Sequence, residues 1–376
     1  MGSPSQRAKW ARRAPWAAPL VTAAVVLAGW QVFSASATGH PNLPARTAAQ
    51  LLAAAQTSKV ASLSGTITGS AALGLPSLPG PDSSASLSWQ SLLAGSHTAR
   101  VWIAGPERQR VALLGTLAES DVIHNGRNVW TYSSQLNEVS HFLLPAHRAR
   151  TRDALVPAAP DARNYTPMGV ANAILKALDP STRVTVDRTQ VVAGHDAYTL
   201  VLSPRDSRST VRKVTIALDS HRFVPLQVQV YGSGSIPAFQ IGFRKLSFAA
   251  PASSLFDFHV PVGATVTSNP LIGRDDAHGR DATADRESTD PHKTTATTKA
   301  PRILGSGWTS IAYFANGLPT GSGAGLLDRA TSPIGSNGDR LLATSLLNVL
   351  FTKDGRVFIG AVAPSMLDHT AAVTPR

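Results

Sequence analysis

Apolar and polar residues alternate through much of the chain between Val184 and Val266. In Val214–Asp219 and Leu226–Tyr231, a large apolar side chain recurs at every second position, which is the period of a half-buried β-strand. Short polar turns separate such segments, and Asp219–Arg222 is the turn between these two. The pattern predicts an antiparallel meander that builds a curved sheet.

The first half of the chain contains a similar set of segments. Val122–Tyr132 holds Asn125-Gly126, a pair typical of the type I′ turn of a tight hairpin. Gly194-His195 marks a further turn in the second half. The other predicted strands are Ser62–Ser70, Ala85–Leu93, Thr98–Ile103, Gln109–Leu114, Glu138–Leu143, Gln190–Ala193, Ala197–Leu202 and Ala238–Arg244.

Helical spacing is found at two places. Thr47-Ala-Ala-Gln50 has the sequence of a capping box, so we expect a helix from Thr47 to about Ser58. Thr166-Pro167 combines a capping hydroxyl with proline at the first helical position, and the apolar residues that follow lie on one face. Asp179-Pro180 ends this second helix.

The N-terminus predicts export. Residues 1–16 form a basic tail, which we expect to stay in the cytoplasm, and residues 17–33 are uncharged and at the lower length limit of a spanning helix. Ala35-Ser36-Ala37 fits a signal-peptidase site, so the segment is either a membrane anchor, which we favour slightly, or a cleaved signal. In both cases the bulk of the chain lies outside the cell membrane.

The remaining divisions follow from composition. Residues 34–46 form a spacer, 47–268 the main domain, 269–302 a disordered linker and 303–376 a small module that we expect to lean on the main domain. In this module the sequence predicts a strand at Thr309–Phe314, a Gly-rich turn at Gly321–Gly325 and a helix near Asp339–Leu347. A hairpin through Lys353–Arg356 leads into Val357–Val362.

Composition and motifs argue against several functions. The chain has no cysteine, which excludes thiol nucleophiles, zinc thiolate sites and a lipidated cysteine. The net charge is +12, but the arginines are dispersed and indicate a solvated face rather than a nucleic-acid site. The sequence lacks a nucleophile elbow, a phosphate-binding loop and a pair of catalytic carboxylates, and its histidines are scattered. We therefore expect a protein that is not an enzyme and uses no cofactor or metal.

The order of elements resembles that of the LolA-like superfamily. Asn125–Tyr132 (NGRNVWTY), Val214–Asp219 running into Pro225-Leu226, and the ending Phe256–Ala264 carry the likeness, which spans about Thr47 to Val266. The family includes lipoprotein carriers and the regulator RseB (MucB), and the tail is similar to that of exported actinobacterial members. The order of the three motifs, rather than any one of them, supports the resemblance.

This resemblance implies a mainly β (α+β) fold: a curved, unclosed antiparallel half-barrel covered by helices, plus a small C-terminal α+β module. It implies binding of lipid or lipoprotein acyl chains in a hydrophobic cavity, in transfer or envelope homeostasis. The alternative is a RseB-like regulator that binds an anti-sigma factor or another membrane protein. The candidate cavity-lining residues are Trp89, Trp102, Trp130, Phe142, Tyr198 and Leu200, and for any single one of them a place in the ordinary core is the favoured alternative.

Overall fold

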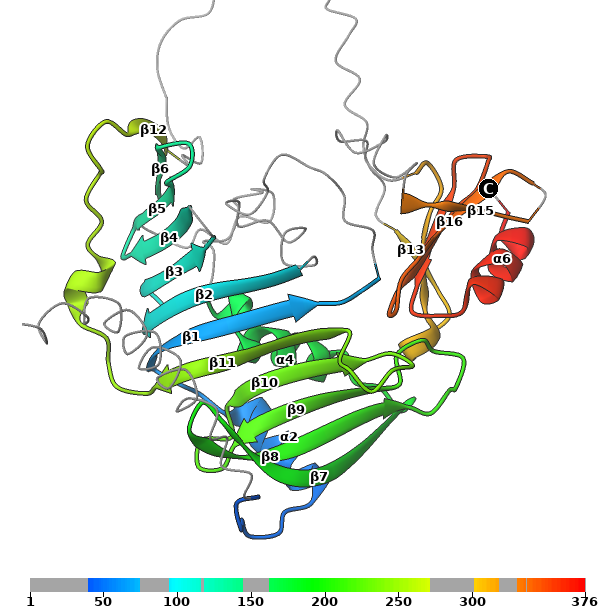
Figure 1. Cartoon of the computed structure of the whole chain (residues 1–376), viewed down its shortest axis with the longest axis horizontal. Helices are drawn as coiled ribbons and strands as arrows, with labels where there is room; N and C mark the ends of the chain where they lie inside the picture. Colours follow the sequence, from blue (N-terminus) through cyan, green and yellow to red (C-terminus); the bar gives the residue numbers. More distant parts are fainter. Residues whose placement is uncertain are drawn as a thin grey trace, which may run out of the picture. The chain divides into compact units, whose positions relative to one another are not determined.

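The computed structural model describes residues 40–74, 95–115, 118–144, 162–270, 301–317, 330–335 and 337–375. Within them, twelve strands form one sheet in the order β12-β6-β5-β4-β3-β2-β1-β11-β10-β9-β8-β7. β12 and β7 are the two edges and do not pair with each other, so the sheet is open as well as curved (Figure 1). This confirms the predicted unclosed half-barrel.

The strand bounds follow the predicted meander closely. The first half comprises β1 (Ser62–Ala71), β2 (Gly95–Ala104), β3 (Arg108–Leu114), β4 (Glu119–Asn125), β5 (Asn128–Ser133) and β6 (Glu138–Leu143). The second half comprises β7 (Thr182–Val192), β8 (His195–Pro204), β9 (Lys213–Asp219), β10 (Pro225–Tyr231), β11 (Phe239–Ser247) and β12 (Thr265–Pro270).

One edge departs from the predicted antiparallel pairing. β12 pairs with β6 in parallel, from Thr265 opposite Glu138 to Pro270 opposite Leu143. Residues 248–264 connect β11 to β12 and so bring the chain to the β6 edge of the sheet. This segment contains the 3-10 turn η3 (Ser253–Phe256). We call residues 248–264 the strap.

Both predicted helices begin where expected. In α2 (Ala48–Thr57), Gln50 N donates to Thr47 Oγ1 at 3.2 Å and Thr47 N donates to Gln50 Oε1 at 2.9 Å. These reciprocal bonds satisfy two backbone donors that the helix leaves free, as a capping box does. In α4 (Pro167–Lys176), Gly169 N donates to Thr166 Oγ1 at 3.4 Å. A short 3-10 turn, η2 (Ala162–Tyr165), precedes α4.

Two hairpin turns differ from prediction by one residue. Asn125 pairs with Asn128, so Gly126 and Arg127 are the turn residues, and of these Gly126 alone has a positive φ, 61°. That agrees with a II′ turn rather than I′. Val192 pairs with His195, which places the second turn at Ala193-Gly194, both with positive φ. Strand register, rather than residue identity, decides which residues turn.

The C-terminal module has its own sheet. Its order is β13-β14-β18-β17-β16-β15 among the described residues. The predicted helix near Asp339–Leu347 is wrong, because Arg340–Ala343 pairs with β17 and forms a strand. Among the described residues, helix α6 comes later in the chain and packs on β17 and β18. The elements are β13 (Arg302–Leu304), η4 (Gly307–Thr309), β14 (Ile311–Phe314), β15 (Ser332–Ile334), β16 (Asp339–Ala343), β17 (Asn348–Phe351), β18 (Val357–Gly360) and α6 (Pro364–Val373).

The module and the large sheet belong to one compact unit, Asn42–Arg376. Trp308 Nε1 donates to Thr182 Oγ1 at 2.8 Å, and Thr210 N donates to Ala361 O at 2.9 Å. Leu346, from the module, is 8% exposed and belongs to the hydrophobic core of the large sheet. These contacts agree with the expectation that the module leans on the main domain.

Several predictions fall outside the described residues. They are the basic tail, the 17–33 segment, the Ala35-Ser36-Ala37 site, the strand at Ala85–Leu93 with Trp89, the turn at Gly321–Gly325 and most of the 269–302 linker. Among the described helices, none has the length and apolar character needed to cross a bilayer.

Candidate functional site

One face of the sheet is apolar and covered by helices. Figure 1 shows α2 and α4 on the same face of the sheet, against its second half. Tyr198 and Leu200 of β8 point to this face, where they pack with Leu51 of α2 and with Ala171 and Leu175 of α4. Tyr198 is 4% exposed and Leu200 is 0% exposed. The predicted pair is therefore part of the core between helices and sheet.

Cross-strand register explains why these side chains meet. Tyr198 lies opposite Leu218 and Leu200 opposite Ile216, so the large apolar residues of β8 and β9 share a face. The opposite face of the same region is polar: Thr215 Oγ1 donates to Gln229 Oε1 at 3.2 Å. Because side chains alternate along each strand, this half of the sheet is amphipathic.

The segment before α2 is tied to the same place. The Tyr198 hydroxyl donates to Pro44 O at 2.9 Å, and Leu43 packs against the core cluster. The tyrosine ring stacks on Phe223, whose other neighbour is the Arg46 guanidinium, 5.0 Å from the ring centroid. A buried tyrosine needs a partner for its hydroxyl, and here the partner fixes the entry of the helix.

Phe142 faces the same side but lies far from β8. Phe142 is the cross-strand partner of Val129, Val129 is the partner of His124, and His124 is the partner of Gln109. Cross-strand partners share a face, so all four lie on the helix-covered face. β6 is second and β8 eleventh in the strand order, so Phe142 cannot share a small pocket with Tyr198. Phe142 is half-buried.

Trp102 and Trp130 lie on the opposite face. Trp130 pairs with Ile123 and His141, and its ring stacks on His141 with centroids 3.8 Å apart. Phe258 of the strap lies 5.2 Å from the Trp130 centroid. Of the six predicted cavity-lining residues, Trp89 lies outside the described residues, and the other five divide between the two faces of the sheet.

The strap covers part of this opposite face. Arg110 Nη1 donates to Leu255 O at 3.4 Å, and Asn125 Nδ2 donates to Phe256 O at 3.3 Å. Phe256 is 1% exposed. Sequence reasoning recognised the Phe256–Ala264 ending as a family motif but did not find its role, which is to cover β3 and β4 and deliver the chain to β12.

An ion pair lies under the strap. Arg110 Nη2 contacts Asp121 Oδ2 at 2.5 Å, while Asp121 Oδ1 and Arg110 Nε are buried and have no hydrogen-bond partner among the described residues. Burial raises the pKa of the Asp121 carboxyl above its ordinary value of 3.8, although the charge and hydrogen bond of Arg110 act to lower it. The neighbouring Glu119 carboxyl raises this pKa too, so burial and Glu119 together outweigh the effect of Arg110.

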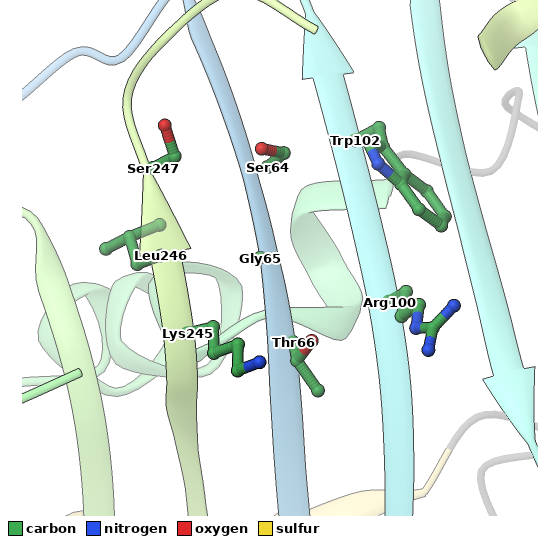
Figure 2. A pocket seen from close by; sticks show the side chains of 8 residues that line it. All are labelled: Ser64, Gly65, Thr66, Arg100, Trp102, Lys245, Leu246 and Ser247. Carbon is green, nitrogen blue, oxygen red and sulfur yellow. The ribbon is translucent and has the colours of Figure 1, made fainter.

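A hollow of about 270 Å³ lies on the opposite face, beside the strap-covered strands. It spans three adjacent strands, β11, β1 and β2, and Figure 2 shows the side chains that line it. Of the lining residues, Trp102 is the one that the sequence identified as a candidate, because alternating Ser and Thr on β1 are typical of an ordinary exposed strand face. The lining residues are Ser64, Gly65, Thr66, Arg100, Trp102, Lys245, Leu246 and Ser247.

Comparison with known proteins gives matches among solved structures. No protein-family model matches the chain, and no curated protein sequence matches it. The MucA/MucB complex of Pseudomonas aeruginosa matches with 14% identity over 86% of this chain and 95% of that chain, TM-score 0.41. A LolA superfamily protein from Nitrosomonas europaea matches with 14% identity over 57% of this chain and 99% of that chain, TM-score 0.22.

An uncharacterized conserved protein from Thermus thermophilus matches with 11% identity over 59% of this chain and 99% of that chain, TM-score 0.32. All three TM-scores lie below 0.5.

Proposed function

We propose that this protein is an extracytoplasmic lipid-binding protein that holds acyl chains, of a lipid or a lipoprotein, between the helices and the sheet. Residues 17–33 anchor it in the membrane, or it is released after cleavage behind Ala37. The observation that carries the proposal is the apolar interface of α2 and α4 with β8 and β9, in the half of the sheet whose opposite face is polar.

The covering helices are suited to move. Each has ten residues, and helices this short are marginal by themselves, so their position depends on contacts with the sheet. An acyl chain that enters between helix and sheet replaces one set of apolar contacts by another. Each methylene transferred from water contributes about 0.8 kcal/mol. Without a ligand, the helices therefore pack directly on the sheet. When an acyl chain is bound between them, the apolar side chains contact the acyl chain instead of water.

The test is native mass spectrometry with lipid extraction on protein purified from its own membranes. Wild-type protein is expected to carry about one acyl species per chain, as a single site predicts. Ala171→Leu fills the interface under α4 and is expected to remove most of this lipid. Ala173→Leu, an equal change at an exposed position of the same helix, is the matched control. Retained lipid in the Ala171 variant, with native circular dichroism, would reject this site.

A second candidate is a regulator that binds a single-pass membrane protein such as an anti-sigma factor. The integration of the module with the main sheet through Leu346 and Trp308 favours it, because one partner segment could then contact both. A photo-crosslinking residue at exposed Leu347 should capture such a protein in cells, and one at exposed Leu136 should not. Equal capture at both positions, or at neither, would count against a partner at the module.

A further inference from the structure

We infer that the hollow on the opposite face is a second binding site, which takes a phosphate group attached to a hydroxylated molecule such as a sugar phosphate. It is independent of the proposed acyl-chain site, because its hydroxyl and cationic side chains and Trp102 emerge from the other face of the sheet, while Leu246 packs against the core.

Two rows of side chains cross the three strands. Thr66 on β1 is the partner of both Lys245 on β11 and Arg100 on β2. Adjacent strands are about 4.8 Å apart, so the Cα atoms of these two cations lie roughly 10 Å from each other with a hydroxyl midway. In the next row, Ser64 is the partner of both Ser247 and Trp102. The bottom of the hollow is thus made of short hydroxyl side chains, and its sides are made of the longer Lys245, Arg100 and Trp102.

The backbone contributes to this shape. The register between β1 and β11 shifts between Thr66 and Ile67, which leaves Arg244 as an extra residue immediately before Lys245. Such a bulge bends a strand and re-aims the neighbouring side chain. The strands approach closely here: a Cβ on Gly65 would lie 2.6 Å from Lys245 O, so this position requires glycine.

The residues that line the hollow carry positive charge. Its eight lining residues include no acid. Within the part of the chain that the structure describes, Lys245 and Arg100 are exposed and take part in no ion pair. Arg110, in contrast, is held by Asp121 and lies with its guanidinium carbon 5.4 Å from the Trp102 ring centroid. Lys245 and Arg100 are therefore available to a ligand, whereas Arg110 is paired with Asp121 and lies against the indole ring of Trp102.

Figure 2 shows how the two cationic side chains are oriented around Thr66. The Lys245 ammonium is turned toward Thr66, and the Arg100 side chain extends from the other side of Thr66 toward the next strand. Since Arg100 is exposed, rotation of its side chain brings the guanidinium back toward the threonine. A phosphate over Thr66 then accepts hydrogen bonds from the hydroxyl and both cations, an arrangement that arginine and lysine favour. Ser64 and Ser247 are left for hydroxyl groups of the same ligand.

The test is calorimetric titration of the full chain with glucose 1-phosphate, with glucose as the uncharged control. Wild-type protein is expected to bind the phosphate ester and not glucose. The double variant R100Q/K245Q is expected to bind at least about tenfold more weakly, as loss of hydrogen bonds to charged groups implies. Thr66→Val, which keeps the strand shape, is expected to weaken binding by a smaller factor. Control R183Q/R188Q removes two exposed cations from β7.

A parallel titration with phosphatidylglycerol and phosphatidylcholine vesicles distinguishes the source of the phosphate. Binding of phosphatidylglycerol alone, lost in R100Q/K245Q but kept in R183Q/R188Q, assigns the hollow to a lipid headgroup. Binding of glucose 1-phosphate with the same variant pattern assigns it to a soluble or polymeric sugar phosphate. Equal weakening by both double variants, or none by R100Q/K245Q, would overturn the proposal in favour of diffuse attraction to a basic surface.

Discussion

At the residue scale, the buried pair of Arg110 and Asp121 is the most unusual electrostatic feature of the described chain. Arg110 donates to Leu255 O on one side and contacts Asp121 on the other, so it links β3 and β4 to the strap. Asp121 Oδ1 has no partner among the described residues. Burial of an incompletely hydrogen-bonded carboxylate is costly, and this is why its pKa is raised.

The raised pKa predicts a pH dependence. The folded chain binds the Asp121 proton more tightly than the unfolded chain, so this group favours folding most below pH 3.8, and its contribution falls as the pH rises through the raised pKa. In Asp121→Asn, this pH-dependent loss of stability should be absent. Urea unfolding at a series of pH values gives the free energy of unfolding of both proteins, and the difference between them at each pH measures the contribution of Asp121. A difference that does not change with pH would show that Asp121 titrates equally in both states.

At the element scale, the strap allows a parallel edge strand in a sheet built from hairpins. It crosses the opposite face, buries Phe256 and places Phe258 against Trp130 and Tyr132. β12 then pairs with β6, which would otherwise be an open edge strand of the sheet. The contacts of these two phenylalanines therefore hold the strap on the sheet, and the strap leads into the edge strand.

Phe256→Ala is accordingly expected to destabilise the protein by about 3–5 kcal/mol, the usual cost of removing a buried phenylalanine. Phe258→Ala, which removes the same side chain from a half-buried position of the same segment, should cost less. Urea unfolding followed by tryptophan fluorescence measures both. Similar small losses would mean that the strap is not anchored through Phe256.

At the scale of the whole molecule, the module completes the core of the large sheet. Leu346 lies in the same cluster as Tyr198 and Leu200, and Ser345 N donates to Leu73 O at 2.9 Å. A module of this size is marginal alone, and these contacts supply apolar surface that it does not bury within itself. We therefore expect the two sheets to unfold together.

Neighbouring leucines test this coupling. Leu346 is 8% exposed and Leu347 is 46% exposed, so Leu346→Ala should lower the free energy of unfolding by about 2–5 kcal/mol and Leu347→Ala by about 0.5 kcal/mol or less. Calorimetry of Leu346→Ala should show one transition, shifted to lower temperature. Two transitions, with only the smaller one shifted, would mean that module and main sheet are separate folding units.

The sequence by itself determined the local elements and the class of fold. Strand alternation, the Thr47 capping box and the Thr166-Pro167 helix start act over a few residues, so they can be read from the chain without its partners. The apolar rows of β8 and β9 were evident for the same reason. Tyr198 and Leu200 accordingly lie where an apolar layer was expected.

Tertiary structure decided which face each strand presents and what covers it. Alternation is the same for both faces, so nothing local could show that Trp102 and Trp130 lie opposite Tyr198. Asp339–Ala343 became a strand because β17 pairs with it, overriding its helical pattern. The strap and the hollow depend on residues more than a hundred positions apart in the chain, such as Arg100 and Lys245. Contacts between such distant residues are set by the register of the folded sheet.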